Sequence, residues 1–136
     1  MNFKSPLLKR LLMTLTVSFL LAGCGKTELK TVKQQQVGEY TLTILSETGT
    51  MKNGSSDFIL EFRRTSDKQL VDVGVVEVAP IMEMSGMAPM MGTATVTPTD
   101  TPGRYQARGT LTMAGLWKFN VKLASGESAR ININAE

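Results

Sequence analysis

The amino-acid sequence predicts an all-β chain that folds as an immunoglobulin-like antiparallel β-sandwich of about seven strands. Over most of its length apolar and polar residues alternate with a period of two, as in a strand with one face in a core. Turn-forming residues separate these runs at roughly 8–12-residue spacing, and no stretch sustains a helical period. The expected strands are 40–44, 58–63, 71–78, 93–97, 104–113, 117–123 and 131–134.

The first three expected strands each have their own pattern. Residues 40–44 alternate Tyr, Leu and Ile with Thr, and 58–63 alternate Phe, Leu and Phe with Ile, Glu and Arg. Valines continue through 71–78, where both faces become apolar towards the end. Gly49 and Gly54 are among the turn-forming residues between the first two runs.

The later strands follow a methionine-rich segment. Threonines dominate 93–97, and 104–113 begins after a turn rich in Pro and Gly at 98–103. The clearest alternation is 117–123, with Trp, Phe, Val and Leu on one face and Lys, Asn and Lys on the other. Ile alternates with Asn in 131–134.

Residues 1–23 are predicted to be a lipoprotein signal peptide. Lys4, Lys9 and Arg10 precede an apolar run too short to span a bilayer comfortably. The run ends in Leu-Ala-Gly-Cys, which resembles the lipobox of bacterial lipoproteins, in which the cysteine is linked to a diacylglycerol. We therefore expect Cys24 to anchor the chain to a membrane of the cell envelope. Gly25, in place of aspartate, favours the outer membrane facing the periplasm.

Removing this leader lowers the Lys+Arg count from 15 to 12, which equals the Asp+Glu count of 12. The net charge of +3 therefore belongs to the leader, and nucleic-acid binding loses its electrostatic basis. The chain has no histidine, and the lipid would use its single cysteine, so we expect no disulfide and no histidine-dependent catalytic or zinc site. With no nucleophile–base arrangement visible, the sequence predicts that the protein is not an enzyme.

The mature chain is expected to form one domain on a tether. Residues 24–37 are polar with isolated aliphatics and predict a flexible tether. Residues 38–136 form the predicted β-sandwich domain. If each of seven strands crosses the sandwich once, alternate connections lie at the same end. The connections with methionine then share one end, and the tether enters at the opposite end.

Methionine is the residue in excess, with nine in the chain. Five lie between residues 82 and 91, separated by Gly86 and Pro89, which favour a loop. The seven that follow the leader are Met51, Met82, Met84, Met87, Met90, Met91 and Met113.

A loop of this composition can bring several thioethers to one point. Thioether sulfur is soft and uncharged, and it selects copper(I) or silver(I) over zinc, magnesium or calcium. The expected metal ligands are Met82, Met84, Met87 and Met90, with Met91 and Met113 in reserve.

The same methionines have a second interpretation, because methionine also fills irregular cores and adaptable contact surfaces. Met51 is expected to be a packing or exposed residue rather than a ligand. Trp117 is expected first as a core anchor, with a cation–π contact to a metal as the alternative. Glu83 is expected to keep the loop soluble rather than to donate an oxygen ligand.

Several short motifs occur in an order that resembles the YtkA-like/FixH-like domain. They include Gly38-Glu39-Tyr40, Asn53-Gly54, the methionine loop, Gly103-Arg104-Tyr105 and Met113-Ala114-Gly115-Leu116-Trp117. The resemblance covers about residues 38–134 and implies a small extracytoplasmic immunoglobulin-like sandwich. Relatives occur as lipoproteins, as membrane-anchored accessory proteins near oxidase-assembly genes, and beside heavy-metal efflux adaptors. Related domains carry histidine near the loop, and its absence here leaves copper(I) or silver(I) as the expected metal.

These observations lead to two functional hypotheses. In the first, a non-catalytic envelope lipoprotein binds copper(I) or silver(I) through the methionine loop and buffers the metal or hands it to an efflux or oxidase-assembly partner. In the second, the loop is an adaptable apolar contact surface of a protein-interaction module and binds no metal.

Overall fold

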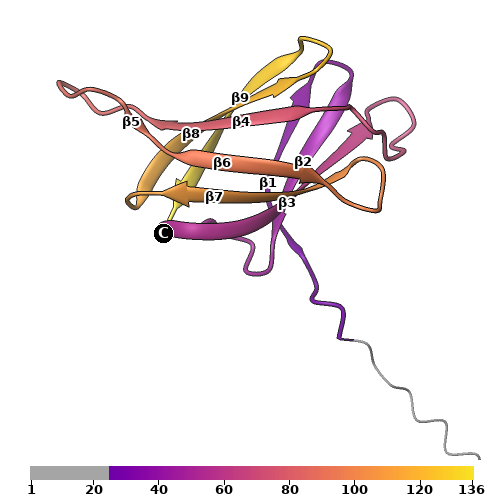
Figure 1. Cartoon of the computed structure of the whole chain (residues 1–136), viewed down its shortest axis with the longest axis horizontal. Helices are drawn as coiled ribbons and strands as arrows, with labels where there is room; N and C mark the ends of the chain where they lie inside the picture. Colours follow the sequence, from indigo (N-terminus) through magenta and orange to yellow (C-terminus); the bar gives the residue numbers. More distant parts are fainter. Residues whose placement is uncertain (1–24) are drawn as a thin grey trace, which may run out of the picture.

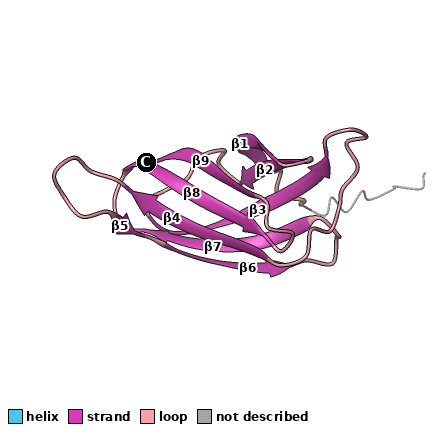
Figure 2. Ribbon diagram, turned by 90° about the horizontal axis from the view of Figure 1, so that it is seen from above, coloured by secondary structure: helices cyan, strands magenta, loops and turns pink. Residues whose placement is uncertain are grey.

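The computed structural model describes residues 25–136, in which two antiparallel sheets pack face to face (Figures 1 and 2). The first sheet has the order β1-β2-β3-β7-β6 and the second the order β5-β4-β8-β9. No helix occurs in this part of the chain, and the predicted all-β sandwich is confirmed. The strands are β1 (Lys30–Val37), β2 (Tyr40–Ser46), β3 (Gly54–Arg64), β4 (Val76–Met82), β5 (Met90–Met91), β6 (Thr93–Pro98), β7 (Arg104–Leu111), β8 (Gly115–Leu123) and β9 (Ser128–Ala135).

The core forms where the apolar faces of the two sheets meet, as the alternation predicts. In β8 every second side chain from Trp117 is buried, and the intervening polar residues face outward. Phe58 of β3 and Phe119 of β8 pack across the sheets with ring centroids 6.0 Å apart. Phe62 and Tyr105 meet edge to face at 5.6 Å within the first sheet. Aromatic pairs in such arrangements add to the stability that apolar burial supplies.

The predicted flexible tether is wrong for residues 30–37, which form β1. This strand pairs along its length with β2, from Lys30 opposite Ser46 to Val37 opposite Tyr40. It is an edge strand whose side chains are mostly exposed, so it lacks the alternation of a half-buried strand. Val37 is the exception, with 1% of its surface exposed.

This extra strand also reverses where the chain enters the sandwich. Because β1 runs antiparallel to β2, the chain enters beside Ser46 and Gly49, where β2 leads into the connection that contains Met51. The prediction that the chain enters at the end opposite the methionine-bearing connections is therefore wrong. The chain enters at the methionine-bearing end, because β1 crosses the sandwich once before β2 begins.

The third predicted strand, 71–78, begins later than expected. Residues 71–75 form a connection instead, and β4 starts at Val76. The backbone N–H of Val71 donates to the Phe62 carbonyl at 3.1 Å, and that of Val73 donates to the Tyr105 hydroxyl at 3.1 Å. Those hydrogen bonds tie the connection to the first sheet and take the place of a strand ladder there.

The predicted signal peptide, residues 1–23, and Cys24 lie outside the described residues. Among residues 25–136, no helix has the length and apolar character needed to cross a membrane.

Candidate functional site

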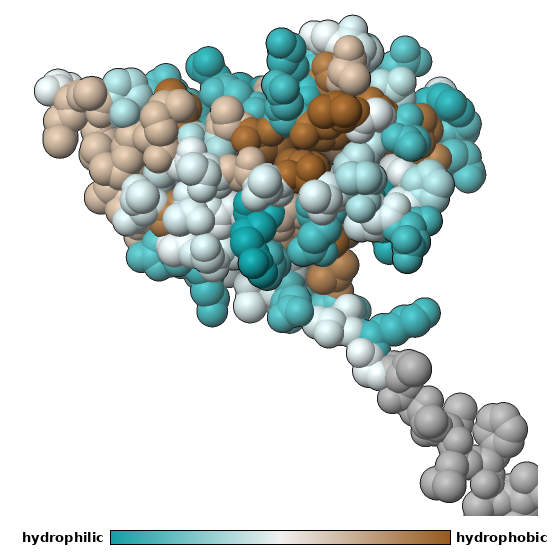
Figure 3. Space-filling view, viewed as in Figure 1, coloured by the Kyte–Doolittle hydropathy of each residue, from teal (hydrophilic) through white to brown (hydrophobic). Residues whose placement is uncertain are grey.

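The methionines gather at one end of the sandwich, which we call the methionine end. It comprises the β4–β5 hairpin (residues 83–89), the β7–β8 turn (112–114) and the β2–β3 connection around Met51. The hairpin projects beyond the two sheets at the left of Figures 1 and 2. Figure 3 shows a group of moderately apolar side chains at the same end.

Specific contacts link these three segments. Met51 forms an isolated parallel bridge with Ala135, and Ala135 pairs with Gly115 at the start of β8. A Cβ on Gly115 would lie 3.0 Å from the Met82 methyl carbon, so the two residues are in close contact. Met82 in turn pairs with Met90 across the hairpin. The structure thus brings together segments up to 84 residues apart, between Met51 and Ala135.

Three methionines face the core, and we call them the inner methionines: Met82, Met84 and Met90. Met82 is 5% exposed, while Met84 and Met90 are half-buried and pack against the core. Met82 and Met90 are directly opposite in the antiparallel register, so their side chains lie on the same face. The short β5 strand is therefore what places methionine side chains from two strands on the same face.

Three further residues, the outer methionines, are exposed to solvent: Met87, Met91 and Met113. Met87 and Met91 are 66% and 62% exposed. The Met87 N–H donates to the Met84 carbonyl at 3.3 Å, so Met87 follows a tight turn that contains Gly86 with φ +77°. Met91 pairs with Ile81 and therefore lies on the face opposite Met90.

Met51 belongs to neither group, because it is almost completely buried in the core. The expectation that it packs is confirmed.

A hydroxyl group from the β7–β8 turn contacts the sulfur of one inner methionine. Thr112 Oγ1 donates to Met90 Sδ at 2.8 Å. This contact joins the β7–β8 turn to β5 and fixes how the sulfur is oriented. Thr112 was not predicted from the sequence, because it is 22 positions from Met90 and lies in the turn that joins the two sheets.

Trp117 lies beneath this end of the sandwich. Its indole is fully buried, and its Nε1 donates to the Met113 carbonyl at 3.0 Å. Gly92, which follows β5, approaches the indole so closely that a Cβ there would lie 3.2 Å from Cζ3. Trp117 is thus a core anchor, as first expected, and it also supports the turn that carries Met113.

Glu83 is engaged outside the group of inner methionines. Its carboxylate forms a salt bridge and hydrogen bond with Lys118 of β8. The hydrogen bond from Lys118 and the attraction of its charge lower the pKa of Glu83 below its ordinary value. The carboxylate therefore stays ionised at neutral pH, and it faces its lysine rather than a shared ligand set.

Acidic side chains in the described part of the chain form no alternative metal site. Among residues 25–136, no group of three or more His, Cys, Asp or Glu side chains is placed to hold a metal ion.

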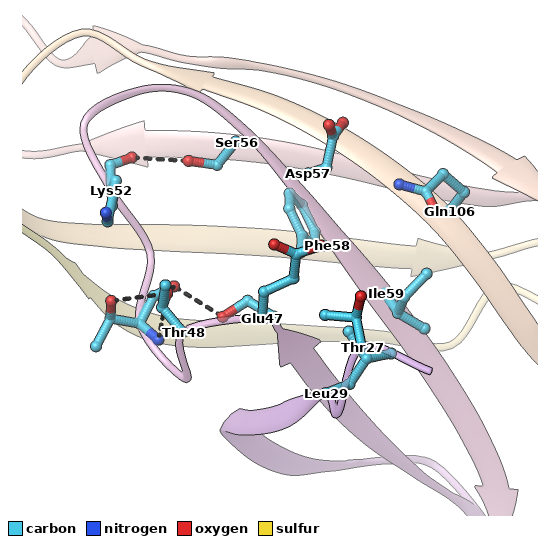
Figure 4. Close-up of a pocket in the computed structure, with 12 residues that line it drawn as sticks. Thr27, Leu29, Glu47, Thr48, Lys52, Ser56, Asp57, Phe58, Ile59 and Gln106 are labelled. Carbon is cyan, nitrogen blue, oxygen red and sulfur yellow. Dashed lines mark hydrogen bonds between the residues drawn. The ribbon is translucent and has the colours of Figure 1, made fainter. Parts of the chain in front are cut away.

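A groove of about 510 Å³ lies on the outer side of β3, next to the N-terminal segment (Figure 4). Thr27, Ser46, Lys52, Asp57 and Gln106 are among its lining residues, and none of the seven methionines lines it. Its polar groups already bond locally, since Ser46 Oγ donates to the Thr50 carbonyl at 2.9 Å. In addition, Asp57 pairs with Arg108. This groove offers less distinctive chemistry than the methionine end.

Comparison with known proteins identifies a family model, described as YtkA-like, that matches residues 33–122. The matched segment begins within β1 and ends within β8, so it includes the whole hairpin and all the inner and outer methionines. Neither a search of curated proteins nor a search of solved structures found a match.

Proposed function

This chain belongs to the YtkA-like family, and we propose that it is a non-catalytic cell-envelope lipoprotein whose methionine end binds copper(I) or silver(I). In this proposal the domain buffers the metal or hands it to an efflux or oxidase-assembly partner, and lipid on Cys24 holds it at the outer membrane facing the periplasm.

One observation carries the metal-binding proposal: Met82 and Met90 oppose one another across a hairpin, with Met84 next in alternation. All three contact the core and so have restricted side chains, and Met84 and Met90 keep part of their surface accessible. Restricted thioethers on neighbouring strands give a soft ion two or three donors at a small ordering cost. Met87 lies one turn further along the hairpin and is free to swing in as an additional ligand.

Exchange with a partner requires a site that releases its ion. Neutral thioether ligands provide no charge to hold the cation, and an exposed hairpin lets a partner approach the metal directly. Both properties favour transfer over permanent storage.

The test is a copper(I) titration of the soluble domain, residues 25–136, against a competing chromophoric chelator under reducing conditions. Replacing Met84, Met87 and Met90 together by leucine keeps their volume and apolarity, so the fold is expected to survive. We expect copper(I) affinity to fall at least about tenfold, which corresponds to about 1.4 kcal/mol. Met51→Leu is the matched control, because it makes the same change in a buried methionine at the same end. Equal affinity of the triple variant and the wild type would refute the proposed site.

Membrane anchoring is tested separately. Replacing Cys24 by alanine is expected to prevent lipid attachment and to move the protein from the membrane fraction to the soluble fraction of the envelope. Membrane retention of that variant would exclude Cys24 as the anchor.

A protein-interaction role is the second candidate, and a different set of residues favours it. Met87, Met91, Met113 and Leu116 are all exposed, at 66%, 62%, 39% and 53%, and all belong to the methionine end or its border. Exposed apolar side chains grouped on one surface are typical of contact sites. In this case leucine at the methionine positions would preserve partner binding, because the contact needs apolar volume and not sulfur.

A further inference from the structure

The seven methionines differ widely in solvent exposure, which the sequence does not indicate. Met87 and Met91 are the most exposed, whereas Met82 and Met51 are 5% and 1% exposed. The two most exposed residues lie on the same hairpin, Met87 at its tip and Met91 on the outward face of β5, while Met113 of the β7–β8 turn is less exposed, at 39%.

A thioether reacts with a peroxide only if its sulfur can be reached, because a sulfur lone pair must attack the peroxide oxygen. In this step one S–O bond forms, the O–O bond breaks, and the displaced hydroxide is released as water after taking up a proton. Sulfur loses two electrons and the peroxide gains two, so one methionine and one hydrogen peroxide give one methionine sulfoxide and one water.

The surroundings of each sulfur predict how well the fold tolerates the added oxygen. At Met87 and Met91 it would enter solvent and disturb no core contact. At Met82, which is 5% exposed, it would enter the core, where a Cβ on Gly115 would already lie 3.0 Å from the methyl carbon, and burying an added polar oxygen costs free energy unless it finds a hydrogen bond. Met90 is intermediate, because the residue is half-buried and its sulfur already accepts a hydrogen bond from the Thr112 hydroxyl.

We propose that Met87 and Met91 form a site of selective oxidation to methionine sulfoxide by hydrogen peroxide. Oxidation there turns an apolar, sulfur-presenting surface into a polar one and leaves the sandwich folded. It also removes soft donors from the hairpin, since sulfoxide oxygen does not share the preference of thioether sulfur for copper(I). The selectivity rests on the exposure of the methionine residues, so it stands or fails independently of metal binding.

The experiment exposes the folded mature protein to hydrogen peroxide and follows each methionine by fragmentation mass spectrometry of tryptic peptides. Trypsin places Met51 and Met113 on separate peptides, and fragmentation resolves the five methionines of the hairpin region. We expect Met87 and Met91 to oxidise at least about tenfold faster than Met51 and Met82. Trp117 fluorescence should not change while these first two oxygens are added, because the indole is buried in an unaltered core.

Two controls make the result decisive. In urea-unfolded protein the seven methionines should react at similar rates, which shows that the fold causes the difference. A Met87→Leu and Met91→Leu double variant should gain two fewer oxygen atoms in the fast phase. Uniform oxidation of the folded protein, oxidation of Met82 at the rate of Met87, or unfolding as the first oxygen is added would each overturn the proposal.

Discussion

Replacing Gly92 by alanine tests how tightly the methionine hairpin is packed onto the sandwich. Gly92 joins β5 to β6, and its N–H donates to the Pro80 carbonyl at 2.9 Å. A Cβ at this position would lie 2.9 Å from the Thr110 carbonyl oxygen and 3.0 Å from the Pro80 Cβ, as well as 3.2 Å from Trp117 Cζ3. Two of these neighbours are backbone or a proline ring, and the third is fully buried, so none can rotate away.

The expected cost follows from two opposing effects. Forcing a methyl group into a packed core destabilises a protein by about 1–3 kcal/mol. Replacing glycine by alanine also restricts the unfolded chain, which stabilises by about 0.4–1 kcal/mol where the backbone is compatible. Gly92 does not have a positive φ, so this second effect applies. The difference between these ranges is about 0–2.6 kcal/mol. Because the Cβ would lie 2.9 Å from a backbone oxygen, we expect the upper part of that range, a loss of roughly 1–2.5 kcal/mol or a fall in Tm of about 4–10 °C.

The assay is urea unfolding followed by tryptophan fluorescence, to which Trp117 is the only contributor. Gly25→Ala is the matched control, because nothing lies within 4 Å of a Cβ at that glycine and its φ is also not positive. A Gly92→Ala protein as stable as the wild type would refute the close packing of the hairpin base against Trp117.

Three other changes probe separate contacts. Val37→Ala should cost about 1–2 kcal/mol in urea unfolding, because it removes two buried methyl groups; a flexible tether would give no change. Thr112→Val removes the hydrogen bond to Met90 and should alter copper(I) affinity. Thr112→Ser keeps the hydroxyl and should behave as wild type in the same chelator competition. Equal affinity of the two variants would contradict a role for the hydroxyl. Burial and the hydrogen bond to Asp72 raise the pKa of Tyr105 to about 12. The contribution of Tyr105 to the free energy of unfolding is therefore fully present below about pH 10 and is lost as the pH rises towards about 12. Tyr105→Phe should therefore lower stability by about 1 kcal/mol at neutral pH and flatten this alkaline loss, as measured by urea unfolding at several pH values.

The sequence predicts the sandwich well where one face of a strand is buried. Predicted strands coincide with β2, β3, β6, β7, β8 and β9, and β6 matches its predicted range of 93–97 most closely. The strand predicted over 71–78 overlaps β4 only at 76–78. The pattern fails for β1, where the run Gln34 to Gln36 is exposed at the edge of a sheet. Backbone pairing alone makes this segment a strand, and pairing with β2 leaves no periodic signal in the side chains.

The connection at residues 71–75 shows the opposite error. Its valines favour a strand locally, but the Val73 N–H donates to the Tyr105 hydroxyl, which in turn donates to the Asp72 carboxylate. A side chain 32 residues away thus supplies the partner that a strand ladder would otherwise provide. Such tertiary contacts override local propensity and cannot be read from the segment itself.

For the candidate site, the sequence predicts which residues gather but not how they divide. Strand order alone was enough to place Met51, the hairpin and Met113 at one end. The division into inner and outer methionines depends on the register of β4 with β5, where Met82 opposes Met90 and Ile81 opposes Met91. A shift of one residue in that register would exchange the two faces of β5, and nothing in a segment of Met, Pro and Gly specifies it in advance.

This division gives the two proposed functions different principal residues, with Met87 common to both as an additional ligand and as an exposed surface residue. A metal ion needs sulfurs whose positions are already restricted, and that requirement is met by Met82, Met84 and Met90. A protein contact or a peroxide needs side chains that can be reached, and that requirement is met by Met87 and Met91. Leucine substitutions confined to the inner methionines therefore act on metal affinity, and oxidation confined to the outer pair acts on the surface. One hairpin carries residues of both sets. We therefore expect oxidation of Met87 and Met91 to change the metal affinity of the inner methionines, and metal binding to change the rate of that oxidation.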